Sequence, residues 1–331
     1  MKRFSCACGQ EVYFDNHYCG ACGSQLGFDP VTKSLRTLTQ KASGWQVLHE
    51  PAQQFKFCEH RDHEVQCNWL IPLEHSDKQC LSCATTRQIP LLDNPDNWRR
   101  WRTLEAAKRR LFYGLLVQQL PIGLNQQPFL RFDFLEDQRS NPKVSLEHVL
   151  SGHHQGVITI NAAEADASYR EAAKEAMNEP YRTLLGHFRH EIGHYYWEIL
   201  IKGGQHYGPF QQCFGDETKD YSASLEAYYS HGPGADWQQE FISAYASAHP
   251  LEDWAETWAH YLLMIETLET ALSYGVIDRV EGDQDFDKWF EEWLELVRVI
   301  NALNRSTGQP DAYPFVVSEN VRKKLKFIHA V

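Results

Sequence analysis

The sequence has no long apolar run and no recognisable leader. Nowhere in its 331 residues does a stretch approach the roughly 18–20 apolar residues that cross a bilayer, which argues against a membrane protein. The N-terminus, MKRFSCACGQ, has two basic residues but lacks the apolar core of a secretory signal. We therefore predict a soluble, cytoplasmic protein with no membrane partner.

Positive charge is also scarce. Lys and Arg number 32 against 44 Asp and Glu, so the formal net charge is −12. A general nucleic-acid binder needs the opposite balance, so nucleic acid is not expected as a partner. Hydrophobic residues make up 43% of the chain, which is enough for a substantial core.

Cysteine is almost absent after residue 83, where Cys213 stands alone. The other cysteines form two sets of four, namely Cys6, Cys8, Cys19 and Cys22, then Cys58, Cys67, Cys80 and Cys83. Without a secretory signal, such closely spaced cysteines favour zinc thiolate sites over disulfides. We predict one structural zinc in each set, with His60 or His63 open as a replacement for one cysteine of the second set. Cys213 is expected to be a small core residue.

The first cysteine set has the spacing of a zinc ribbon. Each of its close pairs is followed by a glycine, Gly9 or Gly23, and glycine permits the tight turn of a zinc knuckle. Two roles are open for the ribbon region. It is either a module that recruits a protein or nucleic acid, or a zinc staple for a stretch too small to hold itself together. We favour the staple.

The expected secondary structure divides the chain at residue 90. Residues 1–90 are predicted to be a zinc-ribbon region with little regular structure, and residues 91–331 a second, mostly helical domain. A helix is expected at 98–119, followed by strands within 128–137 and 153–166. Further helices are expected at 167–177, 180–202, 221–230, 236–248, 250–274 and 285–304. This order predicts an α+β fold with a small sheet.

The helix at 98–119 concentrates positive charge. Its basic residues are Arg99, Arg100, Arg102, Lys108, Arg109 and Arg110. Such a run could bind an acidic partner or nucleic acid, but it is more often the solvated face of an amphipathic helix, and we predict the solvated face.

The stretch FRHEIGHYYWEIL at 188–200 contains the pattern H-E-x-x-H. In a helix His190 and His194 lie on one face, so both rings can reach one ion, while Glu191 can deprotonate a zinc-bound water. This pattern is typical of zincin metallopeptidases. The alternative is that both histidines are ordinary core or surface residues.

A catalytic zinc needs a third protein ligand. The position six residues after His194 is Leu200, which excludes the metzincin arrangement. In the segment 241–261, Glu252, Glu256 and His260 follow one another at four-residue spacing, on one helical face. From the spacing alone, either glutamate could be the ligand. Asp253 lies on another face, where we expect a solvated or capping carboxylate.

The segment AYASAHPLEDWAE resembles the third-ligand region of gluzincin proteases, most closely the lethal-factor type. In those proteases a tyrosine stands seven residues before the liganding glutamate, and a second glutamate follows four residues after it. The resemblance implies that Glu252 binds zinc and that Glu256 fixes the tautomer of a ligand histidine. It implies that Tyr245 assists the oxyanion. Glu256 as the ligand remains the alternative.

The whole chain resembles a bacterial family of zinc-binding metallopeptidases with an N-terminal zinc-ribbon domain. The resemblance is carried by the ribbon cysteines, CNWL at 67–70, RRWRTLEAAKRRL at 99–111, HEIGH, FGDE at 214–217 and FISAYASAHPLEDWAETWAHYL. It implies a zincin-like metallopeptidase domain over 91–331 with one catalytic and two structural zinc ions and a peptide or protein substrate. The alternative function is a zinc-ribbon interaction adaptor whose zincin domain is weakly active or inactive.

Overall fold

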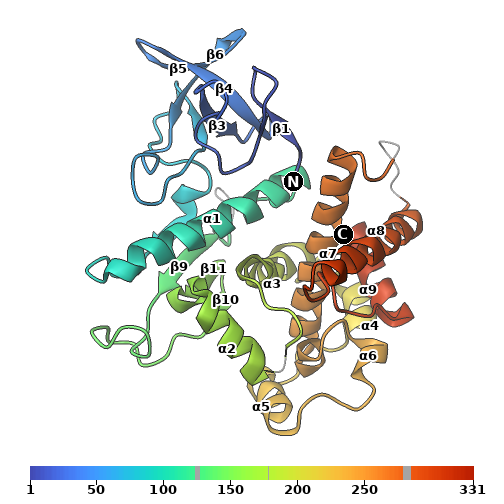
Figure 1. Ribbon diagram of the computed structural model, residues 1–331. Helices are drawn as coiled ribbons and strands as arrows, with labels where there is room; N and C mark the ends of the chain where they lie inside the picture. The colour runs from blue at the N-terminus through green and yellow to red at the C-terminus, as the bar shows by residue number, and fades with distance from the viewer. Residues whose placement is uncertain (124–126, 178, 279–284) are drawn as a thin grey trace. The chain divides into compact units, whose positions relative to one another are not determined.

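The computed structural model describes residues 1–123, 127–177, 179–278 and 285–331. The chain forms two compact units, drawn in Figure 1. The first consists of Met1–Gly152 and Gly156–Arg170, and the second of His153–Gln155 and Glu171–Val331. A cysteine-rich N-terminal region followed by a mostly helical part confirms the predicted α+β class.

The N-terminal part of the first unit is richer in strands than predicted. β1 (Phe4–Ser5) pairs with β2 (Glu11–Val12), and a five-stranded antiparallel sheet follows. Its strands, in order, are β3 (Gln25–Asp29), β4 (Ser34–Lys41), β5 (Gly44–Val47), β6 (Glu50–Phe57) and β7 (Leu70–Pro72). The expectation of little regular structure was wrong because two hairpin turns carry unusual residues. Lys33 and His49 occupy the left-handed region there, where glycine or asparagine is the usual turn signal.

The rest of the first unit contains the long helix α1 (Pro95–Val117) and a parallel group of strands. Asn94 caps α1 and Pro95 occupies its first turn, in agreement with the helix predicted at 98–119. β9 (Arg131–Leu135) pairs in parallel with both β8 (Thr86–Gln88) and β11 (Val157–Asn161). Both predicted strands are thus present. The short helices η1 (Cys83–Thr85) and η2 (Ala162–Ala165) flank this group in sequence, and β10 (Gly152–His154) lies where the chain passes between units.

The basic residues of α1 form the predicted solvated face only in part, since Arg99 and Arg110 are exposed. Arg100, Lys108 and Arg109 are buried, and the guanidinium groups of Arg99 and Arg100 both pair with Asp166. The prediction failed for the buried residues because charge periodicity cannot reveal an anionic partner, here Asp166, that is distant in sequence.

Helices dominate the second unit. They are α3 (Leu184–Tyr196), its π-helical continuation η3 (Trp197–Ile201), α4 (Tyr207–Phe214), α5 (Tyr221–His231), α6 (Trp237–Glu240), η4 (Tyr245–Ala248), α7 (Pro250–Ser273), α8 (Phe286–Ser306) and α9 (Glu319–Ala330). α2 (Ala167–Met177) spans the division between the units. α4 and α9 were not predicted. None of the described helices combines the length and the apolar character that a membrane crossing requires.

The helix expected at 236–248 is broken, which corrects that prediction. α6 stops at Glu240 because Phe241 adopts an extended conformation (φ −127, ψ 147), and only the short η4 follows. The residues between them instead bring the hydroxyl of Ser243 to α7, where it donates to Glu256. A tertiary contact therefore overrides the local helical preference.

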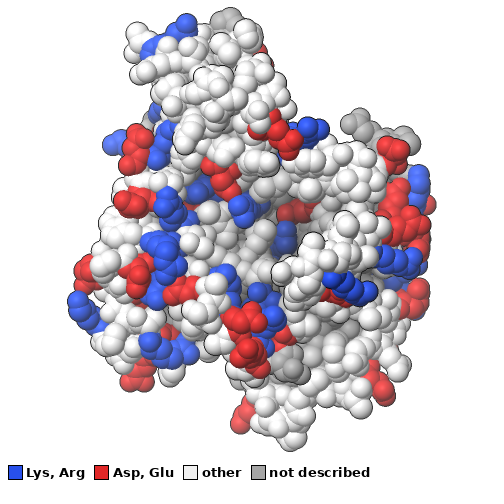
Figure 2. Space-filling view, in the orientation of Figure 1, with Lys and Arg blue, Asp and Glu red and all other residues white. Residues whose placement is uncertain are grey.

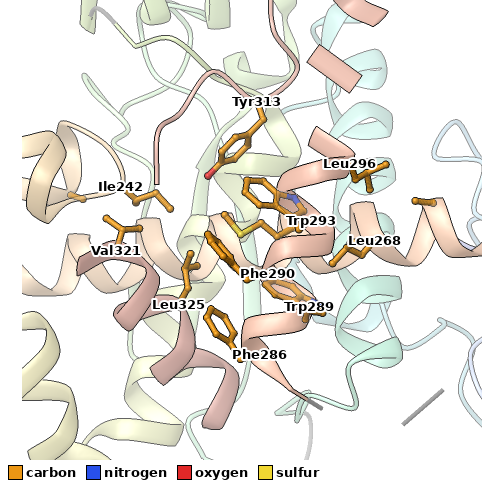
Figure 3. Close-up of a cluster of buried hydrophobic side chains, with 13 residues drawn as sticks. Ile242, Leu268, Phe286, Trp289, Phe290, Trp293, Leu296, Tyr313, Val321 and Leu325 are labelled. Atoms are coloured by element: carbon orange, nitrogen blue, oxygen red, sulfur yellow. The ribbon is translucent and has the colours of Figure 1, made fainter. Parts of the chain in front are cut away.

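The core of the second unit lies between α7, α8 and α9. Figure 3 shows aromatic side chains of α8, including Trp289, Phe290 and Trp293, beside Leu268 of α7 and Leu325 of α9. Burial of these large side chains is the main stabilising contribution here, because each removes much apolar surface from water. The cluster holds α7, which carries two of the predicted site residues.

α3 and α7 approach each other closely at Gly193. A Cβ atom at Gly193 would lie 3.0 Å from the Cα of Ala255 and 3.2 Å from the Cβ of Trp258. The indole Nε1 of Trp254 also donates to the carbonyl oxygen of Gly193 at 2.8 Å. The missing side chain lets α3 come near enough to α7 for side chains of both helices to meet.

Candidate metal centres

Nitrogen and oxygen donors from α3 and α7 converge at one point. The Nε2 atoms of His190 and His194 are 3.2 Å apart. Glu252 places Oε2 at 3.1 Å from His190 Nε2 and Oε1 at 3.5 Å from His194 Nε2. Tetrahedral zinc, with bonds of about 2.0–2.1 Å to nitrogen, separates its donors by about 3.3 Å. The three residues therefore have the donor types and the spacing that zinc requires.

Glu256 contacts the opposite nitrogen of the His190 ring. Its Oε1 lies 2.6 Å from His190 Nδ1, and its Oε2 accepts a hydrogen bond from the Ser243 hydroxyl at 2.6 Å. Although burial raises the pKa of Glu256, the hydrogen bond from His190 contributes to lowering it to about 2, so the carboxylate is charged. An Nδ1–H bond to this carboxylate leaves the Nε2 lone pair free for a metal.

The three donor residues bring electron-pair donors close together. If Nδ1 of His190 donates to Glu256, a neutral ring presents a lone pair at Nε2, 3.2 Å from Nε2 of His194. The Glu252 carboxylate is buried beside them, with Oε2 3.1 Å from Nε2 of His190. A divalent ion would satisfy the facing lone pairs and the buried charge together.

Glu191 is buried on α3 and stays ionised. Its side chain is held by His187, whose Nε2 is 3.3 Å from Glu191 Oε1. Burial works to raise the pKa of Glu191, but the contact with His187 and the neighbouring imidazole of His190 lower it overall. His187 was missed in the sequence, although it stands one helical turn before Glu191 on the same face.

Two tyrosines lie at the cluster, and only one was predicted. The ring of Tyr245 is centred 6.0 Å from that of His190. Burial and the charge of Glu252 raise the pKa of Tyr245, so its hydroxyl remains a donor. Tyr221, at the start of α5, donates its hydroxyl to Glu252 Oε1 at 2.7 Å. No motif or helical spacing connects Tyr221 with Glu252 in the sequence.

Asp253 is not the solvated carboxylate that was predicted. It is fully buried, and its Oδ2 accepts from Lys324 Nζ of α9 at 2.6 Å. Burial raises the pKa of Asp253 to about 7, although Lys324 opposes the change. The contact joins α7 to a helix absent from the prediction, so the partner could not be foreseen.

Cys213 lies half-buried on α4, and burial raises the pKa of its thiol.

Each predicted cysteine set gathers in the first unit. The Sγ atoms are 3.6 Å apart for Cys6 and Cys22, and 3.7 Å apart for Cys8 and Cys19. In the second set, Cys67 and Cys80 are separated by 3.7 Å. Tetrahedral zinc with sulfur at about 2.3 Å requires a separation of about 3.8 Å, whereas a disulfide requires about 2.05 Å. Both sets therefore fit zinc.

The two sets differ in exposure and both consist of cysteine alone. Cys8 and Cys22 of the first set are exposed, whereas all four thiols of the second set are buried. Among the described residues, neither His60 nor His63 replaces a cysteine, because the donor group consists of Cys58, Cys67, Cys80 and Cys83. The two histidine rings instead pack against the indole of Trp101.

Two four-cysteine groups and one His-His-Glu group define a zinc-binding protein. The chain belongs to the family described as "Putative zinc-binding metallo-peptidase", which matches residues 97–331, and a zinc-ribbon domain family matches residues 3–94. These matches confirm the resemblance drawn from the sequence. The predicted boundary at residue 90 stays a prediction.

Related proteins are found in mycobacteria. "Uncharacterized protein Mb2598c" of Mycobacterium bovis and "Uncharacterized protein Rv2568c" of Mycobacterium tuberculosis are each 40% identical to this chain over 343 residues. The alignments cover 100% of this chain and 95% of each relative. No solved structure matches the chain significantly.

Proposed function

We propose that this protein is a zinc-dependent metallopeptidase of the gluzincin type that hydrolyses peptide bonds. His190, His194 and Glu252 would hold the catalytic zinc, and each cysteine set would hold one structural zinc. The observation that carries the proposal is the convergence of both Nε2 atoms and the Glu252 carboxylate within 3.1–3.5 Å, with Glu191 on the same helix.

Zinc bound there would polarise the peptide carbonyl and make water more acidic. The ionised carboxylate of Glu191 would take a proton from the attacking water as its oxygen adds to the carbonyl carbon. Glu191 would then give that proton to the amide nitrogen, so that the C–N bond breaks and an amine leaves. The hydroxyl of Tyr245 would donate to the oxygen that becomes negative during the attack.

The proposal is tested by measuring zinc content and peptide cleavage together. The variants are Glu191→Gln, Glu252→Ala and, as a control, Glu295→Gln at an exposed position of α8. We expect wild type and Glu191→Gln to hold about three zinc ions, with cleavage by Glu191→Gln reduced about 10²–10⁴-fold. Glu252→Ala should hold about two zinc ions, and Glu295→Gln should match wild type in zinc content and cleavage.

Two results would overturn the proposal. One is a wild type that holds only the zinc of the cysteine sets. The other is a fully loaded wild type that cleaves nothing in a diverse peptide library.

A binding role for the ribbon region is the second candidate function. An open hollow of about 990 Å³ lies among residues of the ribbon region, and it includes Tyr13 and Tyr18, which are 64% and 63% exposed. Exposed tyrosines are typical of protein contact surfaces. If a partner protein binds wild type but not a Tyr13→Ser/Tyr18→Ser variant, and no peptide is cleaved, the adaptor function replaces the enzyme.

A further inference from the structure

Arg109 of α1 is a buried cation with few partners. Its side chain lies in the first unit and the residue is only 4% exposed. Nη2 donates to the carbonyl oxygen of Val65 at 3.5 Å, which is a long contact. Within the described part of the chain, Nε and Nη1 have no hydrogen-bond partner. A guanidinium group cannot lose its proton in a protein, so this charge requires a nearby anion.

The carboxylate next to Arg109 on the helix is already occupied. Glu105 is fully buried, and its Oε2 lies 3.1 Å from Nζ of Lys108, which is fully buried as well. Glu105 also accepts from the hydroxyl of Thr86 at 2.5 Å. Since Glu105 and Lys108 balance each other, the charge of Arg109 remains to be compensated.

The second cysteine set provides the missing negative charge. Val65, which Arg109 contacts, stands two residues before Cys67, in the loop between Cys58 and Cys67. Burial works to lower the pKa of Arg109, but the negative charges that Cys67, Glu105, Cys83 and Cys80 can carry raise it overall. Zinc held by four thiolates would carry a net charge of about −2. A buried dianion and a buried cation then stabilise each other.

We propose that Arg109 compensates the charge of a zinc tetrathiolate formed by Cys58, Cys67, Cys80 and Cys83, and that this charge compensation fixes α1 to the second cysteine set. The inference rests on the proposed function only in assigning zinc to that set. Arg109 lies within the residues matched by the peptidase family, whereas the cysteines lie within those matched by the zinc-ribbon family. The second zinc would therefore connect the two family regions.

The first cysteine set provides an internal comparison. Cys8 and Cys22 are exposed, so water can screen the charge there. Its hydrogen bonds to other side chains involve neutral hydroxyls: Cys22 Sγ donates to Ser24 Oγ at 3.3 Å, and the Thr37 hydroxyl donates to Cys6 Sγ at 3.5 Å. Because solvent reaches this set, it does not need a buried cation, and a substitution at Arg109 should leave it unchanged.

The experiment compares Arg109→Met and Arg109→Lys with Arg110→Met. Arg110 is the matched control, because its side chain is 50% exposed and pairs with Asp15 at the surface. Each full-length zinc-loaded variant is incubated with a chelator and a thiol-alkylating reagent, and mass spectrometry reports alkylation at every cysteine. A second readout is the sulfur-to-metal charge-transfer band after replacement of zinc by cobalt.

We expect Arg109→Met to increase alkylation of the second set about 10–100-fold, as when a group that supports metal ligands is lost. The first set should be unchanged, and Arg110→Met should match wild type. The cobalt band should move to lower energy in Arg109→Met, because the thiolate electrons lose the stabilising field of the cation. Arg109→Lys should retain most of the protection, since it keeps the charge.

The inference is overturned if folded Arg109→Met matches wild type in both readouts. If Arg109→Met does not fold, Arg109→Lys tests the inference instead. Complete loss of protection against alkylation of the second set in Arg109→Lys would show that the positive charge does not protect this set. A wild type whose second set is alkylated as fast without chelator as with it would instead contradict the zinc assignment in the proposed function.

Discussion

Glu252 and Glu256 are one helical turn apart on α7 and both reach His190, but they contact opposite ring nitrogens. Glu252 lies 3.1 Å from Nε2 and Glu256 lies 2.6 Å from Nδ1. The spacing alone could not assign the two roles, since both carboxylates share one helical face. The tertiary position of the His190 ring separates them, because only Nε2 also faces His194.

His187 offers a test of how Glu191 is held. We predict that His187→Phe lowers kcat about 10–100-fold, because a hydrogen bond to a charged group contributes about 1.5–3 kcal/mol. His187→Gln, which can still donate, should recover part of the loss. Zinc content should stay at the wild-type value in both variants, since His187 is not among the donors. Equal kcat in His187→Phe and wild type would remove His187 from the site.

The burial of His260 leads us to predict that the free energy of unfolding depends on pH. It is buried on α7, with Nδ1 2.8 Å from the hydroxyl of Tyr313, and burial contributes to lowering its pKa from 6.5 to about 4. The His260 side chain therefore takes up a proton near pH 6.5 in the unfolded chain, but only near pH 4 in the folded chain. Acid thus favours the unfolded state across this window, by about 3 kcal/mol in total.

The measurement is urea unfolding of wild type and His260→Phe at pH 7 and pH 4.5. Wild type should lose more stability than the variant on acidification. The exposed His231→Phe is the control and should follow wild type. An equal loss in His260→Phe and wild type would contradict the assignment.

The crossing of α3 and α7 decides whether the donors meet. We predict that Gly193→Ala destabilises the protein by about 1–3 kcal/mol, because the added methyl group would overlap Ala255 and Trp258. Gly208→Ala on α4 is the control: a Cβ atom there meets nothing within 4 Å, and alanine should be neutral or stabilising by about 0.5–1 kcal/mol. Urea unfolding and zinc content measure both effects, and equal stability of the two variants would exclude close packing at Gly193.

Secondary structure was predictable where local signals were strong. Helices α1, α2, α7 and α8 follow apolar periodicity and caps such as Asn94 and Asp285, so the sequence predicts them within a few residues. The five-stranded sheet was missed because its hairpin turns at Lys33 and His49 lack glycine. The predicted helix at 236–248 failed because Ser243 is needed at Glu256, and no local pattern reports such a contact.

Surface charge bears on the kind of partner. On the face shown in Figure 2, basic and acidic side chains are interspersed rather than gathered by sign. The net charge of −12 also disfavours a nucleic acid as partner, because a polyanion is repelled overall. A peptide or protein remains the proposed substrate.

The two units should respond differently to loss of zinc. The sheet in the first unit has a small apolar cluster of Leu38, Val47, Phe55 and Leu70, whereas the second unit has a large aromatic core around α8 (Figure 3). We predict that chelation under reducing conditions lowers amide protection in residues 1–90 and leaves α8 protected. Hydrogen-exchange mass spectrometry measures this, and readdition of zinc is the control. Equal loss of protection in both units would show that zinc does not support the ribbon region specifically.

The sequence by itself determined the donor sets whose members are close along the chain. The cysteine pairs and the His190–His194 pair follow from turn and helix geometry, which is local. Residue spacing left open which glutamate faces Nε2 of His190, and the tertiary structure shows that it is Glu252, as the resemblance had implied. Only the tertiary structure revealed Tyr221 at Glu252 and Arg109 near the second cysteine set. These relations depend on how distant elements pack, and packing is specified by the whole chain rather than by any one segment of it.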